Sequence, residues 1–290
     1  MPTGIFYTFD TADSHLICVW KIGLWQDEDY VFTGGIMYAW RARIGVLKPT
    51  HRGKTFAFWY KHAPEGVEIV PTFIGFRSGQ KQGFLQGFER AEQLAVDLKE
   101  VGCDIISVSG TPPFLLKGLD FEREWAAKVS KNVGLPVVTP MEPHAIALKS
   151  MGVRRVAVAT YFGDELNQAI VNYFSRFGLE SAVIKGFDFR GRTEDLYTTP
   201  LLALDDVSYM DVYRHCKRGV QQLGASVDAI YINGGGWDAA PAVEILERDL
   251  KVKVVWAIAA EMWLTYHRLS ISNPLTGSGS LLSGTVEPAL

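Results

Sequence analysis

The sequence predicts an α/β protein with two lobes, each built on a parallel sheet, and with the active site in the cleft between the lobes. Short segments rich in β-branched residues alternate with longer segments of helical periodicity from about residue 42 onward. This alternation is typical of a parallel sheet covered by helices on both faces. The second half of the pattern repeats the first, which predicts lobes related by a pseudo-twofold axis.

The predicted strands are short apolar runs, and the predicted helices are the longer stretches between them. Strands are expected at residues 43–49, 67–74, 103–110, 135–140, 154–160, 179–187, 227–234 and 252–259. Helices are expected at residues 87–102, 121–134, 164–178, 211–224 and 240–250, with a further helix after each of the strands at 135–140 and 252–259. Several of these helices end in glycine, which readily adopts the left-handed conformation of a helix C-cap.

The repeat is clearest around two acidic residues. Asp104 and Asp228 each stand six residues before a glycine that ends a strand, Gly110 and Gly234. Each is followed by a helix, a strand and another helix. Ligands of open parallel sheets bind beyond the carboxyl ends of the strands. The loops expected to converge there contain Pro49, Gly110, Glu142, Tyr161 and Gly234.

The repeat also sets the expected domain organisation. Lobe 1 is expected to comprise residues 43–150 and 265–290, and lobe 2 residues 151–264. Residues 1–42 are rich in aromatic and acidic residues and lack helical periodicity. We interpret them as an N-terminal aromatic arm that packs on the domain or on a neighbouring subunit, with a lid over the cleft as the alternative. Such an arm favours a homo-oligomer.

Composition narrows the possible partners. The chain has 290 residues, is 48% apolar and carries a net charge of −3 with mixed signs, so neither nucleic acid nor a membrane is expected as a partner. Its apolar runs are too short to span a bilayer, and its N-terminus lacks the features of a secretion signal. Cys18, Cys103 and Cys216 fit neither a zinc motif nor a disulfide framework, which favours a cytoplasmic protein.

Two small-residue turns occupy equivalent places in the repeats. The first, "VSGTPPFLLKG", offers backbone amides at Gly110 and Thr111 and the Thr111 hydroxyl; the second, "INGGGWDAAPA", offers amides from Gly234 to Gly236. Facing each other, such turns can hold a carboxylate or an enediolate from both sides. The alternative is that both are ordinary tight turns between a strand and a helix.

These motifs resemble a known family. The segment "SGTPPFLLKGLDFEREWAAKVSKNVGLPVVTP", together with "RIGVLKP", "GVRRVAVAT", "DAIYINGGG" and "GSGSLL", is similar to the aspartate/glutamate racemase superfamily, in the branch of arylmalonate decarboxylase and maleate cis–trans isomerase. The similarity covers roughly residues 42–284. It implies two Rossmann-like lobes, a small carboxylate substrate, and catalysis without a cofactor or a metal, in most members by cysteine thiols.

The resemblance also locates what is missing. The two cysteine positions of the superfamily fall on Gly110 and Gly234, so a two-thiol racemase mechanism is excluded, and covalent isomerisation of an alkene is disfavoured. The decarboxylases also have glycine at the first position. Thr111 matches a hydroxyl that binds carboxylate. Pro49 matches the family's proline in the first loop, and Tyr161 or its neighbour Phe162 falls at the position of the family's oxygen-binding tyrosine. Pro112 stands where the decarboxylases have serine.

Glu142 and His144 are the first candidates for the group that replaces the thiol. They follow the strand at 135–140, and Pro143 between them keeps the loop extended. A glutamate whose pKa is raised by an apolar cleft, or a histidine near its ordinary pKa, can transfer a proton. A helix cap that faces solvent is the alternative interpretation.

His51 and Glu261 are two further candidates for acid–base catalysis. His51 comes two residues after Pro49, and the basic residues around it, Lys48 among them, either attract an anionic substrate or form a solvated loop. Glu261 is the counterpart of His144 in the second repeat. It is equally well explained as an ordinary carboxylate in the first turn of a helix.

Two tryptophans are candidates for an aromatic wall of the pocket, and no metal site is expected. Trp237 follows the second glycine turn and is expected to line the pocket, although core packing explains it and Trp256 as well. Glu142, His144 and His51 match no metal motif, so no metal is expected.

The leading hypothesis is a cofactor-independent enzyme that acts on a small carboxylic or carbonyl acid through an enolate. An arylmalonate-decarboxylase-like decarboxylase best fits the two turns that can hold a carboxylate, which we call the cradle, and the missing thiol. Alternatives are a hydrolase or lyase that uses Glu142 or His144, an isomerase resembling maleate isomerases or racemases, and a binding protein that holds carboxylates without turnover.

Overall fold

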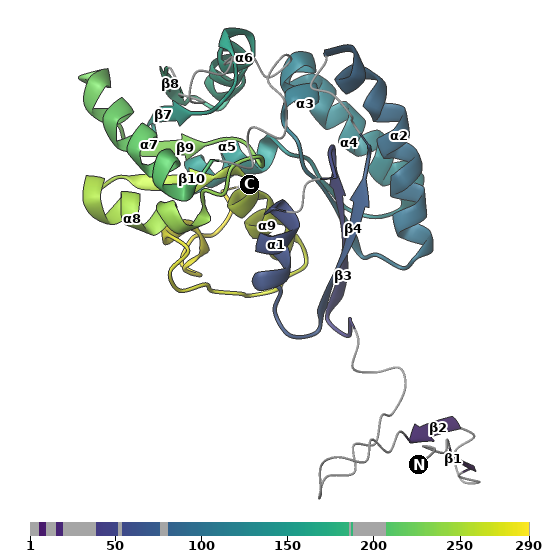
Figure 1. Ribbon diagram of the computed structural model, residues 1–290. Coiled ribbons are helices and arrows are strands. Elements are labelled where there is room, and N and C mark those ends of the chain that lie inside the picture. The colour runs from purple at the N-terminus through teal and green to yellow at the C-terminus, as the bar shows by residue number, and fades with distance from the viewer. Residues whose placement is uncertain are drawn as a thin grey trace, which may run out of the picture.

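The computed structural model describes residues 6–9, 16–19, 39–51, 54–75, 81–185, 187 and 207–289. Within this part of the chain it has the predicted α/β architecture, with two four-stranded parallel sheets (Figure 1). The fold prediction is therefore confirmed. Most of the predicted arm lies outside the described residues; within it, β1 (Phe6–Phe9) and β2 (Leu16–Val19) form an antiparallel pair.

The first sheet has the strand order β4-β3-β5-β6. Its strands are β3 (Ala42–Lys48), β4 (Val67–Phe73), β5 (Ile105–Val108) and β6 (Val137–Val138). The helices of this part of the chain are α1 (Lys54–Lys61), α2 (Lys81–Glu100), α3 (Pro112–Lys117), α4 (Leu119–Val133) and α5 (Glu142–Ser150).

The second sheet has the order β10-β9-β7-β8. If the strands of each sheet are numbered along the chain, both sheets have the order 2-1-3-4, read from β4 in the first sheet and from β8 in the second. Its strands are β7 (Arg155–Ala159), β8 (Glu180–Ile184), β9 (Ala229–Ile232) and β10 (Lys253–Trp256). The helices that follow are α6 (Asp164–Ser175), α7 (Tyr209–Leu223), α8 (Ala240–Leu250), α9 (Ala257–Arg268) and the short 3-10 helix η2 (Ser280–Leu282).

The two repeated aspartates start the central strands of their sheets. The Asp104 carboxylate accepts the backbone N–H of Arg43 at 2.7 Å, beside β3. The Asp228 carboxylate accepts the backbone N–H groups of Arg154 at 3.0 Å and Arg155 at 2.8 Å, beside β7. Each aspartate thus satisfies amides that no neighbouring strand reaches, and it fixes where the paired strands begin.

Helix α9 lies between the sheets and packs against β5, β6 and β10 (Figure 1). Its residues from Ala257 to Tyr266 are all buried, which accounts for a helix with apolar residues on every side; Glu261 and Thr265 are its buried polar residues. The lobe boundary expected at residue 264 falls inside this helix.

Local differences from the predicted elements have clear causes. The strand expected at 252–259 ends at Trp256, because Ala257–Met262 favours helix. Helix α1 was not predicted because its aromatic residues obscure the helical period, and α3 is a short helix with proline in its first turn, where a missing N–H costs nothing. No helix of the described part of the chain is long and apolar enough to cross a membrane.

Candidate active site

A pocket lies where the carboxyl ends of β3, β5, β7 and β9 face each other. These are the central strands at which the chain changes direction across each sheet, and such points form ligand-binding crevices in open parallel sheets. The pocket encloses about 710 Å³, its open mouth included. It is lined by Lys48, Pro49, Thr50, Thr55, Ser109, Gly110, Thr111, Pro112, Pro113, Tyr161, Phe162, Asn233, Gly234, Gly235, Gly236, Ala257, Ile258 and Glu261.

The two glycines that follow β5 and β9 are required by the local geometry. Gly110 has φ +105°, and a Cβ there would lie 2.6 Å from Cγ of Pro49. Gly234 has φ +126°, and a Cβ there would lie 2.1 Å from Cε1 of Tyr161. In both repeats a positive φ and a close ring from the neighbouring loop therefore exclude a side chain.

Backbone amides of these turns are available to a ligand. The amides of Gly110, Thr111, Gly234 and Gly235 make no hydrogen bond to another residue of the described chain. The next amide, that of Gly236, donates to the Tyr161 hydroxyl at 3.2 Å. Amides without a partner at the wall of a pocket favour a negatively charged ligand.

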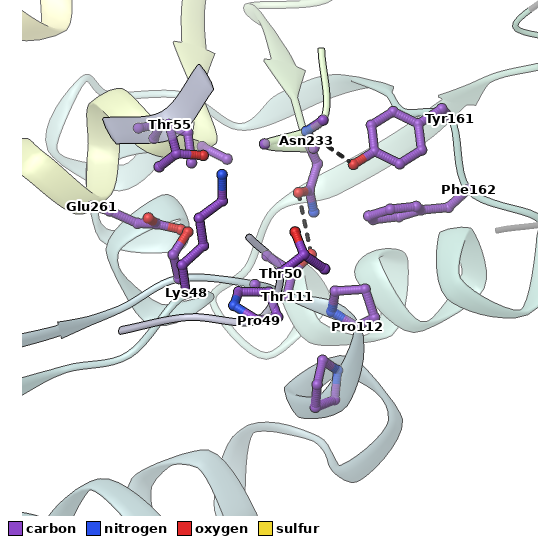
Figure 2. Close-up of a pocket in the computed structure, with 18 residues that line it drawn as sticks. Lys48, Pro49, Thr50, Thr55, Thr111, Pro112, Tyr161, Phe162, Asn233 and Glu261 are labelled. Atoms are coloured by element: carbon purple, nitrogen blue, oxygen red, sulfur yellow. Dashed lines mark hydrogen bonds between the residues drawn. The ribbon is translucent and has the colours of Figure 1, made fainter. Parts of the chain in front are cut away.

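The polar side chains of the pocket come from both lobes. The Thr111 hydroxyl donates to Oδ1 of Asn233 at 3.2 Å, which joins the turn after β5 to the turn after β9 (Figure 2). Nδ2 of Asn233 and Oγ1 of Thr55 are buried and have no hydrogen-bond partner within the described residues. Buried polar atoms in folded proteins usually have a hydrogen-bond partner, so these two donors at the pocket wall are available to a bound molecule.

A buried cation and a buried carboxyl lie at one side of this pocket. Lys48 is 4% exposed and Glu261 is 1% exposed, and Figure 2 shows both at the left, opposite Tyr161 and Phe162. Burial raises the pKa of Glu261 well above its ordinary value, although a hydrogen bond with Ser109 and the charge of Lys48 oppose the shift. The protonated form of Glu261 is therefore favoured.

His144 does not line the pocket and lies behind Glu261. Its Nε2 is 3.7 Å from Oε1 of Glu261, and its Nδ1 is 2.7 Å from the Tyr231 hydroxyl. Burial lowers the pKa of His144 to about 3. The imidazole is therefore neutral and forms no ion pair with Glu261.

Glu142 and His51 also lie outside the pocket lining. Glu142 stands in the first turn of α5, and its Oε1 accepts from Nε and Nη2 of Arg123 at 2.9 and 2.7 Å. His51 is exposed and stacks on Phe73 with a distance of 4.8 Å between ring centroids.

Trp237 and Trp256, the two tryptophans considered for the pocket, pack in the core. Trp237 is fully buried, does not line the pocket, and contacts Tyr161 edge-on at 5.2 Å between centroids. Trp256 packs on Phe58 at 4.9 Å. The aromatic wall of the pocket is instead formed by Tyr161 and Phe162. No group of three or more His, Cys, Asp or Glu side chains in the described residues is arranged to hold a metal ion.

Some lining residues were not singled out from the sequence. Asn233 and Ser109 each precede a turn glycine in equivalent repeat positions, and each donates its backbone N–H to the end of the neighbouring strand, at Ala159 O and Leu47 O. This equivalence could have identified them. Thr55 lies on the unpredicted helix α1 and had no sequence signal.

Comparisons with known proteins agree with this architecture. The family model for arylmalonate decarboxylase matches residues 44–282. Arylmalonate decarboxylase from Bordetella bronchiseptica is 26% identical over 220 residues, which is 76% of this chain and 87% of the relative.

Solved structures show the same fold. A liganded arylmalonate decarboxylase, with one glycine changed to cysteine and one cysteine to serine, has a TM-score of 0.74 at 23% identity, covering 83% of this chain and 98% of that one. A cysteine-to-alanine variant of maleate isomerase from Pseudomonas putida S16, with maleate, has a TM-score of 0.72 at 18% identity, covering 84% and 98%. These findings confirm the resemblance, and the chain belongs to the arylmalonate decarboxylase family.

Proposed function

We propose that the protein is a cofactor-independent decarboxylase of a small malonate-type acid. The observation that carries the proposal is the set of donors without partners among the described residues. They are the buried side-chain atoms Asn233 Nδ2 and Thr55 Oγ1 and the backbone amides of Gly234 and Gly235, and they line one pocket together with Lys48. Donors from both lobes around one cavity suit a dicarboxylate better than a neutral ligand.

In the proposed reaction, these donors stabilise the negative charge that develops when CO2 leaves. One carboxylate of the substrate leaves as CO2, and the electron pair of the broken C–C bond passes into the other carboxylate as an enediolate. Donors already in place around that carboxylate stabilise the developing charge without reorganising. A proton then reaches the α-carbon.

The remaining wall of the pocket favours an apolar substituent. Pro112, Phe162 and Ile258 contribute apolar surface, and Figure 2 shows Phe162 and Pro112 on the side away from Lys48 and Glu261. An aryl or alkyl group at the α-carbon fits this side, because its burial is favourable while the carboxylates face the polar side.

Isomerisation is the second candidate, because maleate isomerases share the fold. One such neighbour, from Nocardia farcinica, holds a covalent succinylcysteine intermediate. None of the described residues lining this pocket is a cysteine. Cys103 and Cys216 lie elsewhere, and burial raises their pKa values to about 11 and about 12, which opposes thiolate formation. A covalent isomerase route therefore has less support.

The test is an NMR time course in D2O with aryl- and alkylmalonates, maleate, α-aryl acids and small β-keto acids and amides. Decarboxylation predicts loss of CO2 and one deuterium at the α-carbon of the product. Formation of fumarate from maleate would indicate the isomerase, and water-dependent cleavage would indicate a hydrolase. Binding of malonates without turnover, seen as a rise in melting temperature, would contradict the decarboxylase and leave a carboxylate-binding protein.

A further inference from the structure

We infer that Glu261 is the acid that delivers the proton to the α-carbon after CO2 has left. The inference rests on the proposed function and adds the identity of the proton donor, which the missing thiol leaves open.

The position of Glu261 carries the inference. Its side chain lines the pocket on α9 and is 1% exposed, and its Oε2 has no hydrogen-bond partner within the described chain. Figure 2 shows it beside Lys48, across the pocket from Phe162. A buried carboxyl with one unpartnered oxygen at a cavity wall is positioned to exchange a proton with a bound ligand.

The other ionisable residues of the lining fit this role less well. They are Lys48 and Tyr161. The Tyr161 oxygen accepts the amide of Gly236 at 3.2 Å and keeps its own O–H, so the choice between these groups depends on acidity. Lysine and tyrosine ordinarily hold their protons to about pH 10, whereas a carboxyl is the stronger acid. A carboxyl that burial keeps protonated combines an available proton with a favourable transfer.

The surroundings of Glu261 favour the protonated acid before the reaction. The ionisable groups that face it are Lys48 at the end of β3, His144 on α5 and Tyr231 on β9, with Glu122 on α4 acting through its charge. His144 is neutral and Glu122 opposes a second negative charge. Lys48 is the cation that favours the ionised carboxylate.

The step balances in protons and charge. The bond between oxygen and hydrogen in the Glu261 carboxyl breaks, the proton forms the new C–H bond with the enediolate's electron pair, and Glu261 is left as a carboxylate. Lys48 stabilises that carboxylate until water returns a proton. Over the whole cycle, a malonate dianion and one proton from solvent give a monocarboxylate and CO2.

The test compares decarboxylation by the wild-type enzyme, Glu261→Gln, Glu261→Asp and Glu247→Gln across about pH 5 to 9. Glu247 is the matched control, because it is a structural carboxylate of α8 that accepts from Val254 and Ser280 and does not line the pocket. Glu261→Gln keeps the size of the side chain but has no acidic proton. We expect kcat to fall by about 10²- to 10⁴-fold with KM little changed, whereas Glu247→Gln behaves as wild type.

The pH profile separates catalysis from structure. Wild-type kcat should fall as the pH rises through the raised pKa of Glu261, because the donor is then ionised, and Glu261→Asp should keep this limb but shift its midpoint. A Glu261→Gln enzyme that folds and keeps kcat within about threefold of wild type would overturn the inference. If that variant does not fold, an alkaline limb that does not move in Glu261→Asp would overturn it.

A second reaction distinguishes this failure from failure of the proposed function. The wild-type enzyme and Glu261→Gln are incubated with the monocarboxylic product in D2O, and deuterium at the α-carbon is followed without any C–C cleavage. Exchange by wild type that Glu261→Gln loses would support the acid even if no malonate is decarboxylated. Neither decarboxylation nor exchange by wild type would overturn both proposals.

Discussion

Gly234 shows how a single residue excludes the thiol that the resemblance places there. Its φ of +126° is strained for any L side chain, and Tyr161 occupies the space that a Cβ would need. Gly110 is constrained in the same way by Pro49. The two residues without side chains allow the backbone to approach a bound ligand closely, and the proposed reaction needs an acid from elsewhere in the pocket.

We predict that Gly234→Cys destabilises the protein by about 2 kcal/mol, because the new side chain overpacks a tight site and the backbone is strained. The double variant Gly234→Cys/Tyr161→Ala should lose less stability than the sum of the two single variants, because Tyr161→Ala removes the ring that the cysteine side chain would otherwise displace. Urea unfolding measures both. Gly163→Ala is the control, because a Cβ there meets nothing within 4 Å and the φ is −72°; full stability of Gly234→Cys would contradict the prediction.

Lys48 is the buried cation of the pocket. Replacement of Lys48 by Met should raise KM for malonates by about 10- to 100-fold, because a charged hydrogen bond to the substrate contributes about 1.5–3 kcal/mol. The exposed Lys131 on α4 provides the control, Lys131→Met, with an unchanged KM. Steady-state kinetics at two salt concentrations would decide, and an unchanged KM in Lys48→Met would place the substrate elsewhere.

The sequence was most informative about the positions of the secondary-structure elements. The eight strands of the two parallel sheets lie within the predicted segments apart from Ala42, which starts β3 one residue early. Short apolar runs between helical segments specify buried parallel strands directly. Helices α1 and α3 were missed because aromatic residues and proline hide their periodicity. A local sequence pattern does not show how each helix is rotated about its axis when it packs against its neighbours.

The site depends on that rotation. Pro49, Gly110, Thr111, Tyr161, Gly234 and Gly235 line the pocket as expected of residues at strand ends. His144 and Glu261 hold equivalent positions in the repeat, yet only Glu261 lines the pocket, because α9 packs between the sheets and α5 lies behind it. Glu142 is paired with Arg123, and His51 rests on Phe73.

Asp104 and Asp228, which precede β5 and β9, are expected to stabilise the protein through the backbone amides that they accept. Asp228→Asn should cost about 1 kcal/mol of stability, since a half-exposed carboxylate that accepts two backbone amides becomes a neutral acceptor. These amides lower the pKa of Asp228, so its contribution is present at neutral pH and is lost as the pH falls through the lowered pKa. Asp104→Asn, which loses the charge beside one amide, should cost less. Equal effects in urea unfolding would contradict this account.

The whole molecule carries several buried ionisable groups, and they determine its response to acid. Burial lowers the pKa of His144 to about 3 and that of His215 to about 4. Both histidines are neutral in the folded protein and take up protons near pH 6.5 when the chain unfolds. Their contribution to stability is therefore complete above about pH 6.5 and is lost as the pH falls toward 3 to 4.

We predict that His215→Leu makes the loss of stability in acid less steep. His215 lies on α7 outside the pocket, and its Nε2 is buried without a partner among the described residues, so an apolar side chain of similar size should be tolerated. Urea midpoints of the variant and wild type, measured between about pH 7 and pH 4, give the two slopes. Parallel slopes would show that His215 is not the group that titrates.

Helix α9 follows the last strand of the second sheet, and it supplies both Ile258 and Glu261 to the pocket. During synthesis, a nascent chain that has left the ribosome only as far as β10 already contains both glycine turns and the cation. It still lacks α9, the helix that fills the space between the lobes, and with it the acid of the proposed reaction. The proposed activity therefore has to wait for α9: the two glycine turns and Lys48 are synthesised first, and the proposed acid, Glu261, is synthesised after them.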